Sequence, residues 1–193
     1  LHLVVVLASH RVKSIGAIYF EGEMAVDATG QAQGRWAGKV TIEKRLGHTD
    51  QTAFADLITA APEFWTSAHR LSGCAALYLR LTYDQDTFPG GIPNITVDIE
   101  GKDDIFDPRT ATTGFTQNAA LCIADYMAHP IFGLGAAIGA EDGISIESLI
   151  EAANICDEQI SLSGGGSEPR YACDGVISLP ETPKTIIEAM LTS

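Results

Sequence analysis

Short apolar runs separated by polar turns occupy the first part of the chain, and this pattern is typical of β structure. Residues 3–7 are a continuous run of Leu and Val, residues 15–20 are mostly apolar, and residues 40–44 alternate with a period of two. We expect a strand at each position. The segment 27–38 carries three glycines among small polar residues and predicts a loop or a weak hairpin tip.

Two longer alternating runs follow at 75–83 and 95–101. In the first, Leu77, Leu79 and Leu81 share one face, because successive side chains of a strand point to opposite sides. The connection between the runs contains Pro-Gly-Gly, which favours turns. We interpret the two runs as an antiparallel hairpin with a long tip.

Helical spacing of apolar residues occurs once in this part of the chain. Residues 51–60 carry apolar side chains at intervals of three and four, which places them on one face of a helix. Thr49 or Asp50 can serve as the N-cap, and Pro62 limits the continuation. We therefore expect a short helix over 51–60.

Beyond residue 112 the pattern predicts helix, helix, strand, helix. Asn118 is expected to cap a helix over 119–127, and Ser145 one over 146–159. A strand is expected over 171–179, and Thr182-Pro183 begins the last helix with an N-cap followed by a first-turn proline. The predicted class is α+β, strand-rich over 1–112 and more helical over 113–193.

The charge balance limits the possible partners. The chain has 193 residues and a formal net charge of −13, and its only adjacent basic residues are Lys44 and Arg45. A nucleic-acid grip requires clustered Lys and Arg, so none is expected. No apolar stretch approaches the roughly 18–20 residues of a membrane span, and none is expected.

The two ends suggest a piece of a longer chain. The first residue is Leu1, and the predicted last helix has no stop signal before Ser193. The apolar run at 3–7 lacks a preceding basic segment, so we interpret it as a strand and not as a signal peptide. We expect truncation at the C-terminus.

One glycine-rich segment and two acidic groups superficially resemble ligand sites. Residues 133–139 contain three glycines, but a helix precedes them and no helix follows directly, unlike a dinucleotide-binding loop. The acidic groups Asp103-Asp104 with Asp107, and Glu141-Asp142, lack the alternation of a calcium loop. We expect a packed glycine-rich loop and solvated turn carboxylates.

Histidines and cysteines do not follow the spacing of a metal or redox motif. We expect reduced, mostly buried thiols, no nucleophile motif at Ser9-His10, and a chance match to a glycosylation signal at Asn94-Ile95-Thr96. No catalytic, cofactor-binding or metal-ligating residue is predicted. The histidines of the chain are His2, His10, His48, His69 and His129, and its cysteines are Cys74, Cys122, Cys156 and Cys173.

Three aromatic residues can be read in two ways. Phe64, Trp65 and Trp36 could mark a surface that contacts a ligand or partner, since Trp is enriched at interfaces. Core packing is the favoured interpretation for each.

An ordered series of segments resembles the central tail-tip proteins of long-tailed bacteriophages: the baseplate-hub, tip-attachment or host-specificity proteins of the lambda type and related prophage proteins. Ala119 stands where the family usually has Pro after the helix cap. This departure is harmless to a helix, because Ala is a good helix former. The segments are 4–20, 77–84, 88–95, 97–102, 105–110, 118–126, 151–158, 170–175 and 186–191.

The resemblance implies a structural, non-enzymatic role in a homotrimeric hub that closes the tail tube and supports host attachment. It implies a barrel-like β domain with an inserted or appended α/β part, other tail proteins as partners, and receptor contact through parts outside this chain. Localisation would be the virion tail tip, assembled in the bacterial cytoplasm. No cofactor and no catalytic residue carries over. The acidic charge suggests a lumen surface that repels DNA.

Two alternatives stay open at this point. A tail-borne cell-wall hydrolase domain would require catalytic groups, but no paired-carboxylate or metal pattern is present. A receptor-binding adhesin module would bind bacterial cells.

Overall fold

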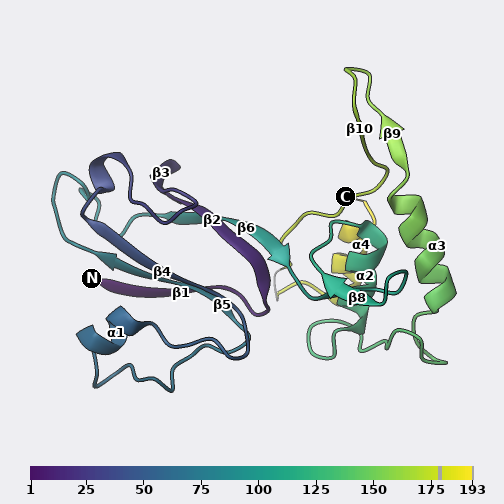
Figure 1. The fold of residues 1–193 in the computed structure, drawn as a ribbon, viewed down its shortest axis with the longest axis horizontal. Coiled ribbons are helices and arrows are strands. Elements are labelled where there is room, and N and C mark those ends of the chain that lie inside the picture. Colours follow the sequence, from purple (N-terminus) through teal and green to yellow (C-terminus); the bar gives the residue numbers. More distant parts are fainter. Residues whose placement is uncertain (178–179, 193) are drawn as a thin grey trace. The chain divides into compact units, whose positions relative to one another are not determined.

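The computed structural model describes residues 1–177 and 180–192. The chain divides into two compact units, Leu1–Asp103 and Asp104–Ser193. Each unit has its own hydrophobic core. Figure 1 shows the helices and strands of both units.

The first unit contains two antiparallel sheets of three strands each. The predicted strands at 3–7, 15–20, 40–44, 75–83 and 95–101 are all present. Neither sheet closes into a barrel among the described residues. The strand order is β1 (His2–Ala8), β5 (Ala75–Leu81) and β4 (Val40–Leu46) in one sheet, and β3 (Glu23–Val26), β2 (Val12–Phe20) and β6 (Ile95–Lys102) in the other.

The two sheets face one another across the main core. Leu77, Leu79 and Leu81 of β5 pack with Ile18 and Phe20 of β2, as the alternating pattern of β5 requires. The segment between β3 and β4, expected as a loop, contains a 3₁₀ turn, η1 (Gly34–Trp36). Its Trp36 ring meets Phe20 edge-on at 5.9 Å between ring centroids.

The opposite face of β5 is covered by α1 (Ala55–Ala60) and the residue before it. Phe54 and Leu57 pack on Ala76 and Tyr78 there. The helix is therefore present but begins later than predicted.

The expected N-cap, Thr49 or Asp50, is wrong. The carboxylate of Glu43 on β4 accepts hydrogen bonds from the first amides of α1, Ala55 N at 3.3 Å and Asp56 N at 3.0 Å. Gln51 is buried and instead bonds the backbone of Gly47 and of residues 70–74. A cap from a distant strand leaves no local pattern in the sequence.

The hairpin predicted from 75–83 and 95–101 is also wrong. β5 pairs with β1 and β4, whereas β6 pairs with β2 in the other sheet. The connection is longer than the two to five residues of a common hairpin loop. Its length allows it to cross between the sheets, and both strands contribute apolar side chains to the same core.

The second unit is built on three helices and two small hairpins. The predicted caps Asn118, Ser145 and Thr182 all accept a hydrogen bond from a first-turn amide. The elements are β7 (Ile105–Asp107), β8 (Thr112–Gly114), α2 (Ala119–Ala128), α3 (Ile146–Cys156), β9 (Gln159–Ser161), β10 (Ser167–Pro169) and α4 (Pro183–Met190).

The core of this unit lies between α2 and α3. Leu121 and Ala124 pack against Leu149 and Ala153, with Ile105 of β7 beside them. In Figure 1 the hairpin of β9 and β10 extends beyond the end of α3. Its strands have three residues each, too short for a detectable period of two.

The strand predicted over 171–179 does not form in its described part. Residues 171–177 contain only an isolated bridge between Ala172 and Asn118, and residues 178 and 179 lie outside the described residues. α3 ends at Cys156, not near residue 159, because the chain enters β9 there. Beyond the hairpin of β7 and β8, the expected order helix, helix, strand, helix is therefore replaced by helix, helix, hairpin, helix.

The connection after β5 is held by an ion pair. Lys39 Nζ lies 2.7 Å from Asp84 Oδ2, and Thr87 donates to Asp84 Oδ1 from its amide and its hydroxyl. The hydrogen bonds from Lys39 and Thr87 lower the pKa of Asp84 from its ordinary 3.8 to about 2. The carboxylate form is thus favoured by folding.

We predict that Lys39→Met raises the pKa of Asp84 toward 3.8, measured by NMR titration of the carboxyl carbon. Because the folded pKa is the lower one, this group stabilises the fold above about pH 4 and ceases to do so as the pH falls through about 2. Lys13→Met, which removes an exposed pair with Glu100, should leave Asp84 unchanged. An unshifted Asp84 in Lys39→Met contradicts the assignment.

Candidate functional site

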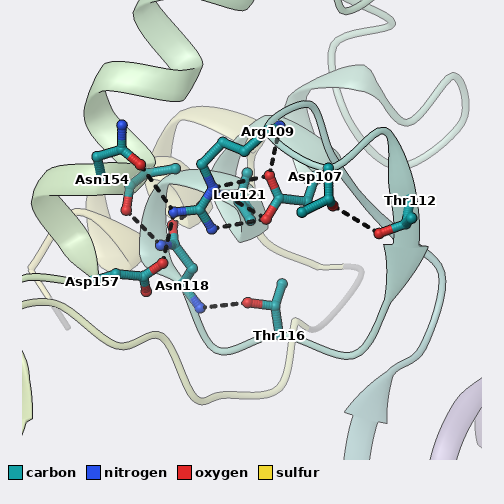
Figure 2. A network of polar contacts seen from close by, with 10 residues as sticks. Asp107, Arg109, Thr112, Thr116, Asn118, Leu121, Asn154 and Asp157 are labelled. Carbon is teal, nitrogen blue, oxygen red and sulfur yellow. Dashed lines mark hydrogen bonds and ion pairs between the residues drawn. The ribbon is translucent and has the colours of Figure 1, made fainter.

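A polar network joins the hairpin of β7 and β8 to the end of α3. Figure 2 shows the Arg109 side chain between Asp107 on one side and Asn154 and Asp157 on the other. Arg109 Nη2 lies 2.8 Å from Asp107 Oδ2, and Nη1 lies 2.7 Å from Asp157 Oδ2 and 3.3 Å from Asn154 Oδ1. One guanidinium thus connects two elements.

The electrostatics of this network favour its charged form. The hydrogen bond from Arg109 lowers the pKa of Asp107, and Asp107 in turn raises the pKa of Arg109. Asp157 is the C-cap of α3, where a negative charge opposes the helix dipole. The positive charge of Arg109 compensates the charge of Asp157. The hydrogen-bond donors of Arg109 are thus used to stabilise the fold.

Asn118 links α2 to α3 and is only 5% exposed. Its Oδ1 accepts from Leu121 N at 3.2 Å, which caps α2, and its Nδ2 donates to Ala153 O in α3 at 2.8 Å. Its amide donates to Thr116 Oγ1, as Figure 2 also shows. The sequence predicted the cap, but a bond to another helix has no local signal.

The glycine-rich segment 133–139 closes the C-terminal end of α2. Leu134 N and Ala136 N both donate to Met127 O, at 3.1 and 3.0 Å. A Cβ on Gly133 would lie 1.7 Å from Tyr126 O. The segment is therefore a packed capping loop, as expected, and its close packing accounts for the glycine.

The acidic candidates are distributed over the chain. Asp103 pairs with Arg11 at 3.2 Å, Asp107 belongs to the Arg109 network, and Glu141 and Asp142 are exposed. Among the described residues, no group of three or more His, Cys, Asp or Glu side chains could hold a metal ion.

Most histidines bond to neighbouring groups. His2 Nδ1 lies 2.7 Å from the Tyr78 hydroxyl, His10 bonds to Arg11 O, and His69 stacks on Trp65. His129 stacks on Phe132 and accepts two amides of the capping loop. His48 lies in the turn after β4. Apart from that of His2 with Tyr78, these contacts join residues close in the chain, and the described structure does not bring the histidines together.

The three aromatic candidates differ in their environments. Trp36 is 4% exposed and belongs to the main core, as predicted. Trp65 packs beside Phe54 and Tyr78. Phe64 is 80% exposed, so the core interpretation is wrong for this residue. Its position in a turn after α1 gives its ring no strand or helix face to cover.

The negative charge is concentrated in the second unit. Residues 104–193 hold 13 acidic residues against three basic ones, a formal charge of −10, while 1–103 hold 12 against nine, or −3. Each of the three cations has an acidic partner: Arg109 as above, Arg170 with Glu158, and Lys184 with Glu188. Phosphate binding would have to break these pairs.

No family model matches the chain. It is similar to tip attachment protein J of Escherichia phage SECphi27, with 32% identity over 111 residues. The alignment covers 49% of this chain and 9% of that protein, so the chain spans less than a tenth of its relative. This supports a relationship to phage tail-tip proteins, the coarser part of the resemblance seen in the sequence.

None of the helices in 1–177 and 180–192 combines the length and the apolar character that crossing a membrane requires.

We predict that Asn118→Ala lowers the free energy of unfolding by about 2 kcal/mol, because it removes the cap of α2 and the interhelical bond to Ala153 O, which keeps the amide of Asp157 as a donor. Urea denaturation monitored by circular dichroism measures this loss. Ser145→Ala removes only the exposed cap of α3 and should cost about 1 kcal/mol. Equal losses would show that the interhelical bond adds nothing.

A second prediction concerns the capping loop. Gly133→Ala should destabilise the chain by about 3 kcal/mol or more, because the new methyl group would overlap the Tyr126 carbonyl. Gly164→Ala is the matched control, since nothing lies within 4 Å of its Cβ position. It should change stability by at most about 0.5 kcal/mol. Similar urea-denaturation midpoints for Gly133→Ala and Gly164→Ala would refute the argument that close packing requires glycine at position 133.

Proposed function

We propose that this chain is a structural, non-enzymatic part of a phage or prophage tail tip. The observation that carries the proposal is the similarity to a tip attachment protein. The arrangement of polar groups agrees with it: Arg109, Asn118 and Gln51 all direct their donors to groups of the chain itself. Such networks hold elements together and leave those donors engaged within the fold.

Within that role, the finer proposal is a trimeric baseplate hub that closes the tail tube. A three-fold ring uses two different faces of each protomer. The first unit offers sheet edges at β1 and β4 and at β3 and β6, and edges of this kind are usually covered by another chain or segment. We propose that the strand-rich part, 1–112, builds a barrel-like wall in this way, while 113–193 forms an appended helical part.

The proposed location is the virion tail tip, after assembly in the bacterial cytoplasm. Its partners would be further copies of the full-length protein and other tail proteins. Host receptor contact would lie in parts outside this chain.

Immunogold electron microscopy of intact particles tests the location. An antibody raised against this chain should label one end of the tail, and the full-length protein should show the mass of a trimer in light scattering. Label confined to the capsid, or particles without the protein, refutes the tail-tip role. A monomeric full-length protein refutes only the hub.

Hydrolysis of purified peptidoglycan by the chain would refute the non-enzymatic role. Specific binding of the chain to bacterial cells, absent with an unrelated acidic protein, would favour an adhesin module. Both assays use the protein without particles, so their results are independent of the microscopy.

The charge distribution leads to a prediction about DNA. The chain should not retard double-stranded DNA in a mobility assay even at about 50 mM salt, where electrostatic binding is strong. The physical reason is the −10 charge of residues 104–193 and the pairing of their cations. Binding that weakens steeply as salt is raised would contradict it. If the acidic surface lines the tail tube in the proposed hub, it would repel the DNA phosphates and let the genome move through the tube without binding.

A further inference from the structure

The segment that follows β10 is tied to the start of α2 at adjacent points. Cys173 N donates to Gln117 O at 2.7 Å, and Ala172 forms the isolated bridge with Asn118. The Gln117 side chain donates to both carboxylate oxygens of Asp174, at 2.9 and 2.7 Å. These bonds fix the backbone on both sides of Cys173.

Cys122 points to the same place from within α2. Its amide donates to Asn118 O, and its thiol donates to Thr116 O at 3.5 Å. Thr116 and Gln117 are neighbours, so both cysteines lie against one short stretch of backbone. The Cys173 thiol is also among the groups that raise the pKa of Cys122. Cys122 and Cys173 thus form a thiol pair.

The other two cysteines are placed differently. Cys74 belongs to the first unit, just before β5, and Cys156 is buried at the end of α3. Cys156 O accepts from Tyr171 N at 3.2 Å, so it lies near the same segment and is the natural competitor for Cys173.

We propose that Cys122 and Cys173 are a redox modification site, which a small-molecule disulfide converts to an intramolecular disulfide bond joining α2 to the segment after β10. The Cys173 thiolate attacks the oxidant's S–S bond, forming a mixed disulfide and releasing one small thiol. The Cys122 thiolate then attacks the Cys173 sulfur and expels the second. Two protein thiols lose two protons and two electrons, and the oxidant becomes two thiols.

The surroundings of Cys122 make the second step slow. Burial is the main cause that raises the pKa of Cys122 to about 12, and the Cys173 thiol and the carboxylates of Asp125 and Asp174 contribute in the same direction. Little thiolate is therefore present near neutral pH. The pair stays reduced in a thiol-rich compartment and closes where a disulfide oxidant is in excess.

The test uses the 193-residue chain with excess oxidised glutathione at about pH 8, without denaturant. After alkylation, trypsin cuts after Arg170 and a glutamate-specific protease cuts between Cys122 and Cys156. We expect Cys122 and Cys173 in one linked fragment, with a mass about 2 Da below that of the two reduced fragments together. Cys74 and Cys156 should carry the alkyl group or a single glutathione, and no cross-link.

The pH dependence provides a second readout. The mixed disulfide at Cys173 should close about tenfold faster for each pH unit, as long as the pH lies well below the pKa of Cys122. Cys122→Ser should stop at the mixed disulfide, while Cys156→Ser should form the cross-link as the natural sequence does. Circular dichroism shows whether each variant folds, and the mapping on the natural sequence requires no variant.

Three results would overturn the proposal: a disulfide between Cys156 and Cys173, mixed disulfides that never close at any pH, or four thiols that remain alkylatable. The proposal does not depend on the tail-tip role, because the cross-link is assayed on the chain alone.

Discussion

The burial of one strand on both faces is the constraint around which the first unit is arranged. β5 is buried at every position except Arg80. Its leucines face the second sheet, while Ala76 and Tyr78 face α1 and its preceding residue. Each buried large apolar side chain contributes roughly 1.5–3 kcal/mol, so the strand requires a layer on each side. The second sheet and α1 supply these layers, and the Tyr78 hydroxyl finds its partner in His2.

The second unit depends on polar connections to a greater degree, because its helices are short and its hairpins have three-residue strands. Asn118 both starts α2 and holds it to α3, and Arg109 fastens the hairpin of β7 and β8 to the end of α3. Polar groups removed from water stabilise a fold only when they are satisfied, and both the buried Asn118 and the half-buried Arg109 have hydrogen-bond partners. These polar connections fix how α2 and α3 pack, and so how the small apolar cluster around Leu121 and Leu149 is arranged.

These features agree with a role in which the chain is a building part. The donors of its main polar networks are occupied within the fold, and the negative charge is concentrated in the unit with the fewest cations. The similarity to a tip attachment protein concerns a small part of that protein. A piece of a large assembly would be expected to hold its own shape and to offer sheet edges and charge to its neighbours.

Local patterns in the sequence determined the positions of the five longer strands and of the helices, while the short strands β3, β7, β8, β9 and β10 were not predicted. The alternation at β5 and β6, and the caps at Asn118, Ser145 and Thr182, act within a few residues, so they can be read directly. The ordered series of segments between residues 4 and 191 also sufficed to suggest a tail-tip relative.

Only the tertiary structure decided which strands pair and which distant groups meet. β5 and β6 were expected to form one hairpin but lie in different sheets, since β1 and β4 occupy both edges of β5 and β6 pairs with β2. The bond of the Glu43 carboxylate to the first amides of α1, that of Asn154 to Arg109, and that of Cys173 N to Gln117 O all join residues far apart in the chain. Hydrogen bonds of this kind depend on where the packed elements place their side chains, and no periodicity in the sequence records that placement.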